Sequence, residues 1–241
     1  MKKQEIMKKI LILIALLPLL ASAQEPLIDS TRMPNAVRFL PPPPAEGSDA
    51  FLYDQSQYRW GKEQRNDSVR CAIAVNDAVW SINNICKIYS GVLGMEISKE
   101  ATPAIYRMLT VGLITTDQVS KLPKNRYMRT RPYVYYDEPT IYPGDEAWLR
   151  TNGSYPSGHT ILGWSAALLL TELVPEKADT ILARGYMYGQ SRVIAGFHWQ
   201  SDVDAGRLCA SAAVARLHAD KRFLKLMKKA RKEFEKLSKK H

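Results

Sequence analysis

Residues 153–175, with the sequence GSYPSGHTILGWSAALLLTELVP, contain the feature that decides the fold. Residues 158–174 are apolar and rich in Ala and Leu, and a proline stands close to each end of this run. Ser157 is a residue type that caps helix N-termini, and Pro175 cannot continue a helix. The segment therefore predicts a helix over residues 158–174. A second helix is expected to open at Pro175 and to run towards Arg192.

Most of the remaining chain also has helical patterns, and strand patterns are sparse. Further helices are predicted over residues 48–83 with turns at Gly61 and Asn66–Asp67, from Pro103 to about 121 with Leu122–Pro123 closing it, over about 198–219, and from Lys221 onwards. Tyr133–Tyr136 has strand-like composition but lies in a stretch rich in Pro, Tyr and Asp, so residues 125–152 are predicted to form a long ordered loop. The predicted fold class is all-α, as a compact single-domain helical bundle.

The first residues have the pattern of an export signal. Four lysines precede an apolar run at residues 10–20, which is too short to span a bilayer comfortably, and Ala21-Ser22-Ala23 offers a cleavage site. We therefore expect a cleaved signal peptide over residues 1–23 and a single domain over 24–241, in the periplasm or secreted. The alternative is an uncleaved anchor.

The formal net charge of +10 belongs to the two ends of the chain. Residues 1–23 carry four Lys and one Glu, which gives +3, and residues 221–241 carry ten Lys or Arg and two Glu, which gives +8. The remaining residues therefore have a net charge of −1. A body so close to neutral does not favour a nucleic-acid partner. The basic helix at about 221–241 is either a solvated face or a weak contact for an anionic surface.

The three cysteines, Cys71, Cys86 and Cys209, allow one disulfide at most, and their pairing cannot be deduced from spacing. The chain has no CxxC motif and no cluster of Cys and His, so no metal site and no cofactor are predicted.

Residues 191–202, SRVIAGFHWQSD, contain a histidine and a carboxylate four residues apart. On a helix His198 and Asp202 would share a face, and Asp202 would fix the tautomer of the imidazole. Such pairs are also common on ordinary helix surfaces. Gly196 offers a break that would let Arg192 end one helix and His198 begin the next, so that both face one pocket. A helix N-terminus there would favour a neutral, nucleophilic imidazole.

Two other segments carry groups that suit a phosphate. Ser157-Gly158-His159 opens a helix, and free amide groups at a helix start bind anions. The segment KNRYMRTRP contains Lys124, Arg126, Arg129 and Arg131. Taken singly, these are a capped helix and a solvated charge cluster. Together with His198 and Asp202 they supply cations, a nucleophile and a proton donor, which indicates phosphoryl transfer.

The motifs Lys124-x6-Arg131-Pro132, Pro156-Ser157-Gly158-His159 and Ser191-Arg192-x5-His198-x3-Asp202 resemble the three-part signature of the type 2 phosphatidate phosphatase superfamily. This superfamily includes bacterial class A non-specific acid phosphatases, membrane lipid phosphatases, glucose-6-phosphatase and vanadium haloperoxidases. The segments LPPPPAEGSDAFLYDQ, GSYPSGHT and HWQSDVDAGR resemble the soluble periplasmic class A branch in particular. The resemblance covers most of the chain after the signal, except the basic tail.

The resemblance implies a metal-independent acid phosphatase with a histidine nucleophile. His198 would attack phosphorus and become a phosphohistidine, and Asp202 would orient it. His159 would protonate the leaving group and then activate water. The phosphate oxygens would be held by Lys124, Arg131, Ser157, the Gly158 amide and Arg192. Because His159 must be protonated while His198 is neutral, a bell-shaped pH profile is expected, at mildly acidic pH if the family is a guide.

The expected partner is a small phosphomonoester, nucleotides included, with transfer of phosphate to alcohols as a second outcome, and a homodimer is the expected assembly. Three alternatives keep the sequence features but change the function. They are a vanadate-dependent haloperoxidase, a lipid-phosphate phosphatase acting at a membrane surface, and a binding protein that uses the basic helix. His218 and His241 have no acidic cluster beside them and are assigned no role in the chemistry.

Overall fold

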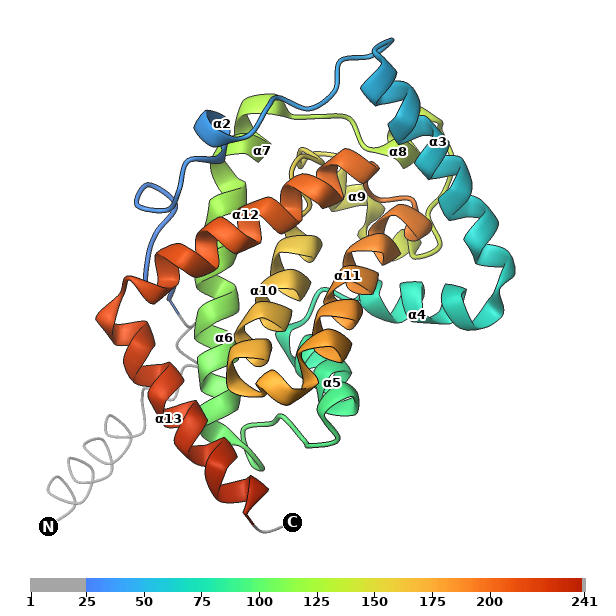
Figure 1. Cartoon of the computed structure of the whole chain (residues 1–241). Helices are drawn as coiled ribbons and strands as arrows, with labels where there is room; N and C mark the ends of the chain where they lie inside the picture. Colours follow the sequence, from blue (N-terminus) through green and yellow to red (C-terminus); the bar gives the residue numbers. More distant parts are fainter. Residues whose placement is uncertain (1–24, 240–241) are drawn as a thin grey trace, which may run out of the picture.

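The computed structural model describes residues 25–239, so the predicted signal peptide lies outside the described residues. Helix α10 (Gly158–Leu173) stands at the centre, and twelve of its 16 residues are buried. In Figure 1, α6 (Pro103–Asp117), α11 (Ala178–Ala195) and α12 (Gln200–His218) surround it. A helix that is apolar all round has to be covered in this way. The helix predicted from the Ala- and Leu-rich run is therefore confirmed, and it is the core of the fold.

The other helices pack around this centre. They are α2 (Ala36–Phe39), α3 (Asp49–Glu63), α4 (Ser68–Ala78), α5 (Ile82–Leu93), α7 (Lys121–Tyr127), α8 (Pro132–Tyr135), α9 (Glu146–Leu149) and α13 (Lys221–Ser238). No strand occurs among residues 25–239, and the all-α fold class is confirmed. Within the same residues, no helix combines the length and the apolar character needed to cross a bilayer.

The turn predicted at Gly61 is wrong, because Gly61 lies inside α3. A Cβ atom at this position would stand 2.9 Å from the carbonyl oxygen of Val193 in α11. The glycine is therefore required by the close approach of two helices rather than by a bend in the chain. The turn at Asn66–Asp67 is confirmed, and the Asp67 carboxylate caps α4 by accepting from the amides of Val69 and Arg70.

The segment predicted as one long loop contains short helices. Leu122–Pro123 does not close the preceding helix; α6 continues through a 3₁₀ turn (Gln118–Ser120) into α7. Pro123 is tolerated because it lies in the first turn of α7, where a missing amide hydrogen costs little. Tyr133–Tyr136 is not a strand either: Pro132–Tyr135 forms α8. These short helices lie between α6 and α10 in the chain.

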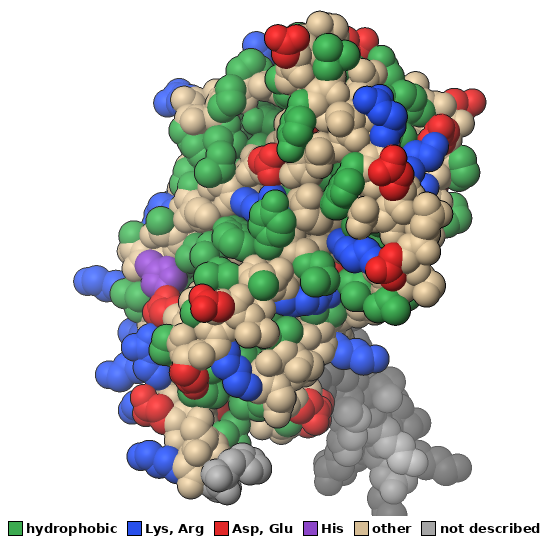
Figure 2. Space-filling model, turned by 45° about the vertical axis from the view of Figure 1, so that its right-hand side comes forward, with side chains coloured by type: hydrophobic (Ala, Val, Ile, Leu, Met, Phe, Trp, Pro, Cys, Tyr) green, Lys and Arg blue, Asp and Glu red, His purple; other side chains and the backbone are tan. Residues whose placement is uncertain are grey.

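The basic tail belongs to the helical bundle. Helix α13 buries Phe223, Met227 and Ala230 against the core, and the Glu233 carboxylate accepts from the amides of Ala104 and Ile105 at the start of α6. Basic residues occupy the outer face, and Figure 2 shows blue side chains projecting where α13 lies, with acidic ones among them. The apolar face of this helix is thus already used for packing. All three cysteines are unpaired.

Candidate active site

His198 lies in the short connection between α11 and α12. Helix α11 ends at Ala195, and Gly196 has φ +88°, a left-handed conformation that favours glycine. The amides of Phe197 and His198 both donate to the carbonyl of Arg192, at 3.1 and 3.3 Å, which folds the chain back on the helix end. Gly196 therefore provides the predicted break. His198 precedes α12 instead of beginning it.

The contact between His198 and Asp202 arises from this helix start and not from two positions on one helix face. The Asp202 carboxylate turns back and accepts from the Trp199 amide at 2.9 Å, as a helix-capping side chain does. The same oxygen lies 3.2 Å from Nδ1 of His198. Because a carboxylate only accepts, Nδ1 carries the proton of the neutral ring, and the lone pair is on Nε2.

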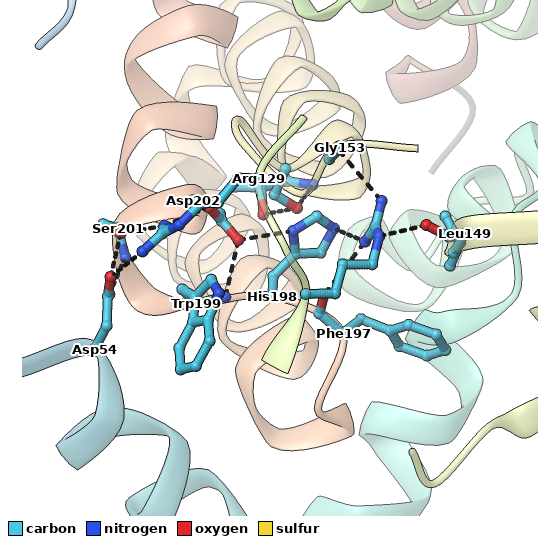
Figure 3. Close-up of polar contacts among 12 residues, drawn as sticks. Asp54, Arg129, Leu149, Gly153, Phe197, His198, Trp199, Ser201 and Asp202 are labelled. Atoms are coloured by element: carbon cyan, nitrogen blue, oxygen red, sulfur yellow. Dashed lines mark hydrogen bonds and ion pairs between the residues drawn. The ribbon is translucent and has the colours of Figure 1, made fainter. Parts of the chain in front are cut away.

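The Nε2 lone pair of His198 faces Arg131, which donates to it. Figure 3 shows the imidazole between Asp202 on one side and a guanidinium group on the other, and Nη1 of Arg131 stands 3.1 Å from Nε2. Arg131 itself is fixed by carbonyl oxygens, and its Nε donates to those of Leu149 and Asn152 at 3.0 and 3.1 Å. The ring is 2% exposed. The arrangement holds a neutral imidazole in one tautomer with its lone pair beside a cation.

Two residues without a predicted role hold Asp202 in place. Arg129 donates from Nη1 to Asp202 at 2.7 Å and from Nη2 to Asp54 at 2.7 Å, and both carboxylates are fully buried (Figure 3). Asp54 also accepts from the amide and the hydroxyl of Ser201, at 2.8 and 2.6 Å. Arg129 stands in the basic segment singled out from the sequence, but no local signal separates it from its neighbours. Asp54 comes from α3, far away in the sequence.

The start of α10 packs directly behind the histidine. Ser157 caps this helix, since its hydroxyl accepts from the Thr160 amide, and its own amide donates to the Asp202 carbonyl at 2.9 Å. His159 points its Nε2 at the Ala78 carbonyl, 3.0 Å away at the end of α4. A carbonyl only accepts, so this nitrogen carries a proton and Nδ1 is the atom that can exchange one. The capping role predicted for Ser157 is confirmed.

The predicted cations converge on the same place. Lys124 donates from Nζ to the Gly153 carbonyl at 2.7 Å. Arg192 is fully buried, its guanidinium lies 4.3 Å from the centre of the Phe197 ring, and none of its three nitrogen atoms has a hydrogen-bond partner. Buried polar groups are almost always paired, and an unpaired buried cation is costly. The unpaired guanidinium therefore marks the place of an anionic ligand.

Burial, reinforced by neighbouring positive charges, depresses the pKa values of the site. Burial and then Arg192 lower the pKa of His159 well below its usual range, and burial and then Arg131 do the same to the pKa of His198. Burial, assisted by Arg131, lowers the pKa of Lys124 to about 7, and burial lowers the pKa of Arg192 to about 9. Both imidazoles are therefore neutral in the free protein, and negative charge in the site would reverse these shifts.

A cleft of about 260 Å³ leads to these groups. Five of the predicted residues line it: Lys124, Arg131, Gly158, His159 and His198. Ser157, Arg192 and Asp202 stand behind them, with 0% of their surfaces exposed. The structure thus brings all eight predicted residues together. Among residues 25–239, no group of three or more His, Cys, Asp and Glu side chains has the arrangement of a metal site.

Fold and cleft together define an all-α protein with a buried cluster of cations beside two histidines. A family model described as the PAP2 superfamily matches residues 102–224, a span that includes all eight predicted residues. The chain therefore belongs to the PAP2 superfamily.

The matching relatives include proteins described as non-specific acid phosphatases. The one from Providencia stuartii is 45% identical over 206 residues, which cover 85% of this chain and 83% of that protein. The one from Salmonella typhimurium is 44% identical over 201 residues, covering 83% and 80%. The one from Salmonella typhi is 40% identical over 218 residues, covering 88% and 85%. The similarity extends beyond the matched family segment to most of each chain.

Proposed function

We propose that this protein is a non-specific acid phosphatase that hydrolyses small phosphomonoesters, nucleotides included, through a phosphohistidine intermediate. The observation that carries the proposal is the buried guanidinium of Arg192, none of whose nitrogen atoms has a hydrogen-bond partner, in a site where Asp202 holds the neutral ring of His198 in one tautomer. A tetrahedral dianion would pair with Arg192, Arg131 and Lys124 together. Relatives described as acid phosphatases support the same assignment.

The first step transfers the phosphoryl group to the protein. The Nε2 lone pair of His198 bonds to phosphorus while the bond from phosphorus to the ester oxygen breaks. That oxygen takes a proton from Nδ1 of His159, whose other nitrogen is held by the Ala78 carbonyl. The cations of Lys124, Arg131 and Arg192, with the Ser157 hydroxyl and the Gly158 amide, stabilise the charge on the phosphate oxygens.

The second step releases the phosphate. His159 takes a proton from a water molecule, the water oxygen bonds to phosphorus, and the bond from phosphorus to Nε2 breaks. Inorganic phosphate leaves, and His198 is restored. An alcohol in place of water would give phosphotransfer. No metal ion takes part in this scheme, because the protein's own cations fill that role. Burial and the neighbouring Arg192 keep His159 neutral in the empty site. When the dianion binds, its charge raises the imidazole pKa, and His159 takes up its proton from the solvent.

Export to the periplasm, release of residues 1–23 and assembly into a dimer complete the proposal. The export signal is a property of the sequence alone, and the dimer is an expectation from the family. Weak contact of α13 with an anionic surface would be electrostatic only, since Phe223 and Met227 are buried in the bundle.

The test measures hydrolysis of a chromogenic phosphomonoester with and without a metal chelator. His198→Ala should lower kcat by about 10⁴-fold or more, because removal of a nucleophile disables both steps. The matched control is His218→Ala, whose histidine lies outside the cleft and pairs with Glu172. Full activity of His198→Ala would disprove the nucleophile. Loss of wild-type activity on chelation would disprove the metal-free scheme.

A further inference from the structure

Two tryptophans at the mouth of the cleft have no part in the scheme above. Trp80 and Trp148 both line the cleft that contains His159 and His198, and their surfaces are 45% and 48% exposed. Single exposed aromatic side chains are ordinary on a protein surface, but here two of them line the same cleft. Trp199, in contrast, is buried in the same region and has its indole nitrogen paired with the Thr130 carbonyl. The two exposed rings are therefore available to a ligand.

Trp80 stands beside the proposed proton donor. Its ring centre lies 4.6 Å from that of His159, and its Cη2 atom lies 3.6 Å from the position that a Cβ on Gly158 would take. It follows Ala78, whose carbonyl binds His159, by only two residues. The leaving oxygen must be close to His159 to receive its proton, so the group attached to that oxygen passes Trp80.

Trp148 reaches the cleft from a different element. It belongs to α9, and the next residue, Leu149, accepts from Arg131 through its carbonyl. The same backbone that fixes Arg131 therefore fixes the position of Trp148. Polar side chains that line the cleft beside the two rings include Asn125, Asn152, Asp117 and Lys121. Two of these side chains are neutral amides, one is an acid and one is an amine, so they do not give the cleft beside the rings a single sign of charge.

We infer that Trp80 and Trp148 form a leaving-group subsite that favours phosphomonoesters of planar aromatic groups, either aryl phosphates or nucleoside monophosphates, over aliphatic ones. Indole rings stack on any planar π system and gain little from a short flexible chain. This inference rests on the proposed phosphatase activity and names the substrate class that the same cleft prefers.

Trp148→Ala is the variant that tests the subsite. For each of phenyl phosphate, adenosine 5′-monophosphate and glycerol 1-phosphate, kcat/KM of the variant is divided by that of the wild type, so that the intrinsic reactivity of each ester cancels. The ratio should fall about tenfold for at least one aromatic ester, which corresponds to the loss of one stacking contact. For glycerol 1-phosphate it should stay near one. Trp148→Phe should restore most of the loss.

Two further variants make the result specific. Tyr53→Ala removes an aromatic ring that is also exposed but does not line the cleft, and it should leave all three ratios near one. Trp80→Ala should change all substrates, because its ring also contacts His159. A loss confined to phenyl phosphate would show that Trp148 contacts a ring attached directly to the ester oxygen. A loss confined to the nucleotide would show that it contacts a base separated from that oxygen by a sugar. Equal ratios for the three esters in Trp148→Ala would overturn the inference, whereas a wild type inert towards all three would overturn the proposed function instead.

Discussion

At the scale of single residues, the pair of buried carboxylates bridged by Arg129 makes the sharpest prediction. Arg129→Lys keeps the charge, but an ammonium group cannot reproduce two separate guanidinium contacts with Asp54 and Asp202. Asp202 would then lose part of the hold that orients His198, and kcat should fall by about a hundredfold, as expected for a misplacement of about 1 Å. Steady-state kinetics on a phosphomonoester measure this.

The matched control is Arg107→Lys on the exposed face of α6, which should leave kcat unchanged. Wild-type kcat in Arg129→Lys would show that the bridge does not orient Asp202.

The sequence identified His198 and Asp202 but not Arg129, the residue between the two carboxylates. The motif places four cations within eight residues, and which of them faces inward depends on Asp54, whose segment is 75 residues away in the chain.

At the scale of helices, the site depends on how closely α10 and α12 approach. Gly206 of α12 faces the first turn of α10, and a Cβ on it would stand 2.9 Å from Cβ of Thr160 and 3.0 Å from the Ser157 carbonyl. Gly206→Ala should therefore push the Ser157–His159 turn away from Asp202. The expected losses are about 1–3 kcal/mol in the free energy of unfolding and a lower kcat, since overpacking moves backbone. Chemical denaturation and kinetics give both quantities.

Gly91→Ala is the control for helix propensity. Gly91 lies in α5, and a Cβ there meets nothing within 4 Å, so alanine should raise the free energy of unfolding by about 0.5–1 kcal/mol. If Gly206→Ala raised the free energy of unfolding as Gly91→Ala does, the close approach of α10 and α12 would be unimportant.

Both glycines are helical, and the sequence does not tell them apart. The same limit explains Gly61, whose interpretation as a turn failed because its neighbour Val193 is 132 positions away.

At the scale of the whole molecule, the helical class followed from the sequence, because capping residues and prolines act locally. The set of candidate site residues came instead from the resemblance of three separate motifs to a known family. The course of residues 121–152 did not follow, because the contacts that hold this segment come from distant parts of the chain. The Trp199 indole donates to the Thr130 carbonyl, and Arg131 donates to the Phe197 carbonyl. The sequence predicted the distribution of surface charge along the chain but not the buried charges. Composition located the excess of basic residues at the chain ends, whereas the charges that matter for the site are buried cations in a nearly neutral body.

These buried cations make the stability of the whole protein depend on pH and on anions. Lys124, with its pKa lowered to about 7, and His159 and His198, with pKa values well below the usual range, are harder to protonate folded than unfolded. The unfolded chain therefore binds more protons, so the free energy of unfolding decreases as pH falls from about 10.5 towards 7 through Lys124 and below about 6.5 through the histidines. A dianion in the site would raise these pKa values and so reduce the loss. Sulfate, which stays dianionic across this range, should thus raise Tm more at about pH 5.5 than at about pH 8.5. Thermal unfolding at constant ionic strength measures the difference.

Lys124→Met, which removes one of the three cations, should show a smaller effect of sulfate on Tm at both pH values. A wild-type Tm shift that is the same at both pH values would contradict the linkage between site charge and stability.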